Sequence, residues 1–177
     1  MSDTQVFYLH GFGSTAESDT VKKLRKDFPD AIGLDYDHND PRLSILSLIV
    51  QINSSDKYPI IVGSSLGGWY AEQLTNHIVA DFVLYNPSME PEVTLARHGL
   101  SPDVLAKYER MRIRRGISHN SRSVLLAIDD EIIDYRVAFD KYRNNSRVML
   151  TDGGHRMTET NMQLIIDRIK YLQNQLP

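Results

Sequence analysis

The feature that most constrains this fold is a Gly-x-Ser-x-Gly motif at residues 63–67, with Ser65 at its centre. A short apolar, β-branched run precedes the motif at 58–62, and a helix-compatible run follows it at 69–74. A strand that turns sharply into a helix at such a serine is a nucleophile elbow. The turn strains the serine backbone, and a glycine two residues away on either side avoids collisions with neighbouring backbone. The pattern therefore predicts that Ser65 is a nucleophile.

Short apolar runs alternate with helix-like segments along the rest of the chain. Strands are expected at 6–9, 31–36, 58–62, 82–85, 124–128 and 148–150. Helices are expected at about 18–28, 41–52, 69–74, 135–142 and 158–173. This alternation predicts an α/β fold with a mostly parallel sheet and helices on both faces. Ligands of such sheets bind beyond the carboxyl ends of the strands, which is where Ser65 lies.

Two of the expected helices show an apolar face that should pack on the sheet. In the helix that begins at Pro41, this face is expected to consist of Leu43, Leu46, Ile49, Val50 and Ile52. In the closing helix, it is expected to consist of Met162, Ile165, Ile166, Ile169 and Leu172.

Later strands supply the groups that a serine nucleophile requires. A serine hydroxyl needs a base to take its proton, and the base needs a carboxylate to orient it. The order along the chain in α/β-hydrolases is Ser, then Asp or Glu, then His. An acidic group at 129–131 follows the fifth expected strand, and a Gly-Gly-His loop ending at His155 follows the last. Ser65, Asp130 and His155 are therefore the predicted catalytic triad.

The acid and the histidine both have alternatives. Asp130 is preferred because an aliphatic pair follows at 132–133, as in many hydrolase acid loops, and Asp129 is the close second choice. Asp152 lies only three residues before His155 and would struggle to reach the far side of the ring. The other histidines are expected at the surface: His38, His77, His98 and His119.

A tetrahedral intermediate also needs two backbone N–H donors for its oxyanion. Leu66, the residue after the nucleophile, is expected to supply one of them. The loop after the first strand should supply the other, because His10-Gly11 brings the N–H of Phe12 to the same edge of the sheet. Gly11 permits the close approach, and His10 is expected to brace the loop by hydrogen bonding.

Five blocks, taken as a set, carry a family resemblance. They are residues 8–12, 63–71, 86–87, 130–136 and 153–155. The set resembles the YqiA/YcfP-type small α/β-hydrolase (esterase) family over nearly the whole chain. The resemblance implies an α/β-hydrolase fold with a reduced sheet, and a serine esterase whose triad is Ser65, Asp130 and His155. Family members often have Gly before the Asp-Glu pair, whereas this chain has Asp129, so the choice of acid stays open.

Residues 1–177 are expected to form one domain with a short helical cap inserted at about 88–122. Loops at this point of an α/β-hydrolase cover the site and usually determine substrate choice. The insertion carries seven basic against four acidic side chains: Arg97, Lys107, Arg110, Arg112, Arg114, Arg115 and Arg122 against Glu90, Glu92, Asp103 and Glu109. This excess gives the hypothesis of a cap that favours anionic substrates, with a solvated helix face as the alternative.

Composition excludes several other classes. A formal net charge of −3 argues against a general nucleic-acid-binding protein, and the lack of cysteine excludes disulfides and a thiol nucleophile. No apolar stretch reaches the ~20 residues that span a bilayer, and residues 1–5 lack the pattern of a signal peptide. We therefore expect a cytoplasmic protein without cofactor or metal that acts on a small-molecule ester or thioester.

Two other functions compete with a serine esterase. Gly11, Gly13 and Ala16, followed by a helix and a strand that ends near Asp35, fit a Rossmann dinucleotide fingerprint. Alternatively, the chain keeps the α/β-hydrolase fold as a binding protein without catalysis. The elbow and the ordered acid and histidine favour hydrolysis of carboxylic esters through an acyl-enzyme.

Overall fold

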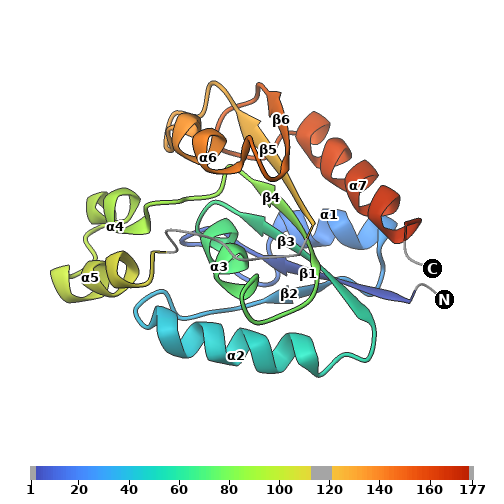
Figure 1. Ribbon diagram of the computed structural model, residues 1–177, viewed down its shortest axis with the longest axis horizontal. Helices are drawn as coiled ribbons and strands as arrows, with labels where there is room; N and C mark the ends of the chain where they lie inside the picture. The colour runs from blue at the N-terminus through green and yellow to red at the C-terminus, as the bar shows by residue number, and fades with distance from the viewer. Residues whose placement is uncertain (1–2, 113–120, 176–177) are drawn as a thin grey trace.

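Six parallel strands form one sheet within residues 3–112 and 121–175, which the computed structural model describes (Figure 1). The strands are β1 (Thr4–Leu9), β2 (Ile32–Leu34), β3 (Tyr58–Ser64), β4 (Asp81–Tyr85), β5 (Arg122–Ala127) and β6 (Arg147–Thr151). They pair in the order β2-β1-β3-β4-β5-β6, and each neighbouring pair is parallel. Each expected strand is therefore present, and the predicted parallel sheet is confirmed.

Helices cover both faces of the sheet. They are α1 (Asp19–Asp27), α2 (Pro41–Asn53), α3 (Leu66–Leu74), α4 (Pro91–Thr94), the 3₁₀ helix η1 (Ala96–His98), α5 (Pro102–Arg110), α6 (Tyr135–Tyr142) and α7 (Glu159–Gln173). α1 and α7 pack on one face, and α2, α3 and α6 pack on the other. α4 and α5 lie at the end of the molecule away from the chain termini (Figure 1). Among the described residues, no helix has the length and apolar character needed to cross a membrane.

Alternation along the strands divides the core into two layers. In β1, Phe7 and Leu9 belong to the layer under α2 and α3, whereas Val6 and Tyr8 belong to the layer under α1 and α7. Successive side chains of a strand point to opposite faces, so a strand that is covered on both sides is apolar throughout. This explains why the sequence shows these strands as continuous apolar runs.

The expected apolar face is confirmed for α7, whereas for α2 it is confirmed at Ile52 and wrong at Leu43, Leu46 and Val50. All five apolar side chains expected to face the sheet from α7 are buried. In α2, the buried residues are Pro41, Ser44, Ile45, Leu48 and Ile52, whereas Leu43, Leu46 and Val50 are exposed.

The reason for the different rotation of α2 is a polar contact. The Ser44 hydroxyl donates to the Asp37 carbonyl oxygen at 2.8 Å and accepts from the Asp37 N–H at 2.9 Å. Ser44 thereby closes the loop between β2 and α2, which turns this polar residue inward. Apolar side chains occur nearly all round α2, so the hydrophobic pattern alone does not determine which face is buried.

The insertion after β4 is tied to the body of the protein by a buried phenol. Tyr108 of α5 is fully buried, and its hydroxyl lies 3.0 Å from that of Tyr70 on α3. The same hydroxyl donates to the carbonyl oxygen of His38 at 2.8 Å. α5 is therefore fixed against both α3 and the loop before α2.

Ion pairs neutralise part of the positive charge expected in this insertion. Arg112 pairs with Glu90 at 3.1 Å and also with Glu92. Arg122 lies in β5, where its buried side chain pairs with Glu72 at 3.2 Å. Arg114, Arg115 and His119 lie outside the described residues. Two of the seven cations that suggested a basic cap are thus matched by carboxylates.

Glu72 is also the centre of a buried polar cluster behind the nucleophile helix. Besides Arg122, its carboxylate pairs with Lys141 at 3.3 Å and accepts from the Tyr142 hydroxyl at 2.9 Å. These contacts join α3 to β5 and α6, the two elements that flank the acidic group at 129–131.

The corrected face of α2 can be tested with two equivalent substitutions. Leu48→Ala should lower the free energy of unfolding by about 2–5 kcal/mol, because it empties a fully buried site. Leu46→Ala, the matched control on a side chain that is 53% exposed, should cost about 0.5 kcal/mol or less. Urea unfolding measures both. Equal losses, or a larger loss at Leu46, would contradict the observed rotation of the helix.

Candidate active site

Ser65 lies between β3 and α3 in a backbone conformation that few non-glycine residues adopt. Its φ is 54° and its ψ is −120°, and its side chain does not cap α3 by a hydrogen bond. Such a backbone conformation destabilises the folded protein by about 1–3 kcal/mol and persists only where the surrounding structure enforces it. The hydroxyl is thus presented at the end of the strand, as the sequence predicts for an elbow.

Two glycines of the motif make this turn possible. A Cβ on Gly63 would lie 2.6 Å from the carbonyl oxygen of Gly67. A Cβ on Gly67 would lie 2.1 Å from the carbonyl oxygen of Leu9 and 2.4 Å from that of His10. Both contacts are with backbone, which cannot move aside as a flexible side chain could. α3 therefore begins in direct contact with β1.

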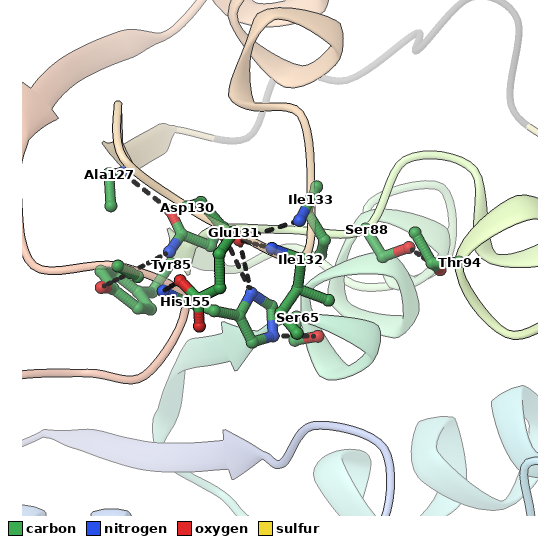
Figure 2. A network of polar contacts seen from close by, with 12 residues as sticks. Ser65, Tyr85, Ser88, Thr94, Ala127, Asp130, Glu131, Ile132, Ile133 and His155 are labelled. Carbon is green, nitrogen blue, oxygen red and sulfur yellow. Dashed lines mark hydrogen bonds and ion pairs between the residues drawn. The ribbon is translucent and has the colours of Figure 1, made fainter. Parts of the chain in front are cut away.

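The structure brings the three predicted triad side chains together (Figure 2). The Nε2 atom of His155 lies 3.1 Å from the Oγ of Ser65. On the other side of the ring, Nδ1 lies 2.9 Å and 3.1 Å from the two carboxylate oxygens of Asp130. With the proton on Nδ1, the ring donates to the carboxylate and leaves Nε2 to accept the serine proton.

Asp130 is held in a fixed orientation. Its side chain is 1% exposed, and its Oδ1 accepts hydrogen bonds from the backbone N–H groups of Ile132 and Ile133, each at 2.8 Å. These two hydrogen bonds fix the direction in which the carboxylate points. The aliphatic pair that favoured Asp130 in the sequence thus contributes through its backbone.

The two neighbouring acids hold the histidine loop by its backbone. Asp129, the second choice for the triad acid, accepts from the N–H of Gly153 at 3.1 Å and from that of Gly154 at 3.0 Å. Glu131 accepts from the N–H of His155 at 3.0 Å. Of the three consecutive carboxylates, only Asp130 faces the imidazole ring.

Further contacts fix the same loop from inside the protein (Figure 2). The carbonyl oxygen of Gly154 accepts from the Tyr85 hydroxyl at 2.9 Å and from the Asn86 side-chain amide at 3.0 Å. The Asn86 side-chain oxygen accepts from the N–H of Ala127 at 2.8 Å, and Asn161 donates to the carbonyl oxygen of Asp152 at 2.8 Å. Sequence reasoning did not assign these residues a role. The available signals were the Asn-Pro pair after β4 and a polar residue on the buried face of α7.

The loop expected to supply an oxyanion donor lies directly against Ser65. A Cβ on Gly11 would lie 3.3 Å from the Cβ of Ser65, and Phe12 and Leu66 line the same cavity as Ser65. Leu66 is the first residue of α3, where backbone N–H groups have no partner within the helix.

His10 braces this loop, as the sequence predicts. It is buried, its Nε2 lies 3.1 Å from the Asp35 carboxylate, and its ring stacks on Tyr36 with the centroids 4.6 Å apart. The Tyr36 hydroxyl also donates to the His10 carbonyl oxygen at 2.5 Å.

A cavity of about 640 Å³ opens beside Ser65 and His155. Apolar side chains form part of its wall: Phe12, Leu95, Ile132, Ile133, Met157 and Met162. Hydroxyl groups form another part: Ser14, Ser18, Thr20, Ser88 and Thr94. His98 also lines the cavity, and its ring centroid lies 4.9 Å from that of Phe12. Within the described part of the chain, no group of three or more His, Asp or Glu side chains is arranged to hold a metal ion.

The dinucleotide interpretation of the first forty residues is wrong. A Rossmann sheet has the strand order 3-2-1-4-5-6, whereas β1 here lies between β2 and β3. The Asp35 carboxylate is occupied by the N–H of Ala16 at 2.7 Å and by His10, so it serves the loop.

Comparison with known families identifies the chain. The sequence model of the uncharacterised protein family UPF0227 matches residues 5–173. The chain belongs to the UPF0227 family. UPF0227 is the YqiA/YcfP family that the sequence blocks resemble. A UPF0227 protein from Vibrio vulnificus is 29% identical over 159 residues, which cover 83% of this chain and 87% of the relative.

Solved structures share the fold of this UPF0227 protein. Mouse alpha/beta hydrolase domain-containing protein 10 superposes with a TM-score of 0.77 at 16% identity, over 98% of this chain and 90% of the other. Est1E from Butyrivibrio proteoclasticus, with ferulic acid bound, superposes with a TM-score of 0.74 at 13% identity, over 97% of this chain and 88% of the other. The predicted α/β-hydrolase fold is therefore confirmed.

The contact between Asp129 and the histidine loop predicts a pH-dependent stability. The N–H groups of Gly154 and Gly153 hold the pKa of Asp129 below its ordinary value of 3.8. A carboxyl whose folded pKa is lowered stabilises the protein above its unfolded pKa, and this stabilisation is lost as the pH falls through the lower folded value. Asp129→Asn should therefore lower the free energy of unfolding at pH 7, with a deficit that shrinks below about pH 3.8.

Urea unfolding of both proteins between pH 7 and pH 3 measures this deficit. Asp152→Asn is the matched control, because its carboxylate lies in the same loop without a bond to the loop backbone among the described residues. A deficit for Asp129→Asn that stays constant into acid would contradict the assignment.

Proposed function

We propose that this UPF0227 protein is a serine hydrolase that cleaves carboxylic esters through an acyl-enzyme. One observation carries this function: the His155 ring bridges the Ser65 hydroxyl and the Asp130 carboxylate at 3.1 Å and 2.9 Å. These distances lie within the range for proton transfer along hydrogen bonds. The same three groups in this order activate a serine in α/β-hydrolases.

Acylation begins when the Oγ of Ser65 bonds to the ester carbonyl carbon and its proton passes to Nε2 of His155. The Asp130 carboxylate stabilises the imidazolium that forms. The negative charge that develops on the carbonyl oxygen is received by the N–H groups of Leu66 and Phe12. The bond to the leaving alcohol then breaks, the alcohol takes the proton from Nε2, and the acyl group stays on Ser65.

Deacylation repeats these steps with water. A water molecule gives a proton to Nε2 and bonds to the acyl carbon. The bond to Oγ breaks, the proton returns to Ser65, and the carboxylic acid is released. His155 thus acts first as a base and then as an acid in each half of the reaction.

The cavity supports a small-molecule substrate. Its volume of about 640 Å³ lies within the ~300–1,000 Å³ of ligand sites, and its wall combines apolar and hydroxyl side chains. We therefore propose esters of small carboxylic acids as the substrate class, with thioesters as the second class that the same chemistry attacks.

Labelling by a fluorophosphonate tests the nucleophile. The wild-type protein should form a covalent adduct at Ser65, and Ser65→Ala should form none and lose about 10⁴- to 10⁶-fold in kcat on short-chain esters. Ser64→Ala is the matched control, because Ser64 lines the same cavity without a bond to His155. Peptide mapping locates the adduct. A folded wild-type protein that neither reacts with the probe nor hydrolyses esters would instead be a binding protein with this fold.

Two neighbouring substitutions test the acid. Asp130→Asn should lower kcat by about 10⁴-fold, because the amide no longer holds the ring in the tautomer that leaves Nε2 free. Asp129→Asn should lower kcat much less, because Asp129 bonds to the loop backbone. Steady-state kinetics on one ester compares the two variants. A collapse of kcat in Asp129→Asn alone would show that the acid is Asp129.

A further inference from the structure

A second hollow lies between the edge strand β6 and helix α7. It has a volume of about 250 Å³ and shares no lining residue with the cavity at Ser65. Side chains of β5 and β6 form its floor, and α7 forms its wall. We call it the β6–α7 groove, and it does not depend on the proposed function.

The groove exists because α7 does not cover the last strand. Leu125 of β5 and Met149 of β6 are paired in register, so their side chains lie on the same face of the sheet. Leu125 is 5% exposed under α7, whereas Met149 is 38% exposed. With Leu164 of α7, these two side chains form an apolar surface that is open on one side.

Two arginines meet at one end of this apolar surface. Arg147 is paired in register with Ser123, and the Ser123 hydroxyl accepts from Nε of Arg168 at 2.6 Å. The Arg168 guanidinium also lies over the ring of Tyr171, 4.6 Å from its centroid. Burial lowers the pKa of Arg168 and the positive charge of Arg147 lowers it further, whereas Tyr171 and Asp81 oppose part of this shift. The two cations are therefore close enough to repel one another.

Neither cation is neutralised by an ion pair among residues 3–112 and 121–175. Two carboxyl groups lie in the neighbourhood. Burial raises the pKa of Asp81, although the charge of Arg168 opposes this shift. The exposed Asp167 lines the groove and accepts a hydrogen bond from Gln163 at 2.8 Å. Two converging guanidinium groups without a bound carboxylate form a site that an anion would stabilise.

We propose that the β6–α7 groove binds a small amphipathic carboxylate, with its head between Arg147 and Arg168 and its hydrocarbon part on the apolar floor. The planar guanidinium group matches the two oxygens of a carboxylate. The volume of about 250 Å³ holds roughly eight groups the size of a water molecule, at ~30 Å³ each. Ligands of the size of hexanoate or benzoate fit this estimate.

NMR of the methionine methyl groups can locate the ligand, because methionines line both the β6–α7 groove and the cavity at Ser65. Met149 lines the β6–α7 groove, whereas Met157 and Met162 line the cavity at Ser65. Titration of the protein with hexanoate should shift the Met149 methyl signal in a saturable way. Hexanol, the neutral analogue, should bind with a dissociation constant at least about tenfold higher, because it lacks the charge. Hexyl phosphate distinguishes a carboxylate site from a general anion site.

Charge-removing variants test the two arginines. Arg147→Gln and Arg168→Gln should each weaken hexanoate binding by at least about tenfold. Lys170→Gln is the matched control, because it removes a positive charge from the same helix outside the groove and should leave the affinity unchanged. Circular dichroism establishes that each variant is folded, and Arg147 is exposed, so its replacement leaves the core intact.

Five results would overturn the proposal. Hexanol could bind as tightly as hexanoate, or hexyl phosphate could bind in preference to it. The two arginine variants could bind like the wild type. Hexanoate could shift Met157 and Met162 while Met149 stays unchanged, which would place the ligand beside Ser65. Sedimentation could reveal a dimer in which the Met149 signal does not respond, so that a second copy covers the groove.

Discussion

The close approach of α3 to β1 is the constraint on which the candidate site depends. Gly67 lies so near the carbonyl oxygens of Leu9 and His10 that no side chain fits at this position. The contact holds Ser65 at a φ of 54° and places the loop with Gly11 beside it. One helix start therefore determines the position of the proposed nucleophile and of both proposed oxyanion donors. The strain at Ser65 is local, and the packing of two core elements sustains it.

The acidic residues at 129–131 and the loop that carries His155 form a second unit, in which each acid makes a different contact. Asp130 orients the imidazole ring, whereas Asp129 and Glu131 hold the backbone that carries it. Tyr85 and Asn86 bind the same loop from the side of the sheet. The loop that carries His155 is thus held at three backbone N–H groups and two carbonyl oxygens.

The sequence predicted those parts of the structure that depend on local pattern. The strands, the elbow and the order of Ser65, Asp130 and His155 follow from runs and motifs only a few residues long. The buried face of α2 did not follow, because the contact of Ser44 with Asp37 outweighed the apolar periodicity. The sequence also did not show that Arg122 belongs to β5, because its partner Glu72 lies fifty residues away in the sequence.

The pair of Glu72 and Arg122 has a consequence for how this protein can diverge. Both side chains are almost completely buried, and the loss of Glu72 would leave the charge of Arg122 in the core without its carboxylate. Glu72, in contrast, would keep Lys141 and Tyr142 if Arg122 were lost. Replacement of Glu72 and Arg122 together by apolar groups would avoid the buried unpaired charge, but Lys141 and Tyr142 would lose this carboxylate. A change at position 72 should therefore be tolerated less well than a change at position 122, because three partners depend on the Glu72 carboxylate.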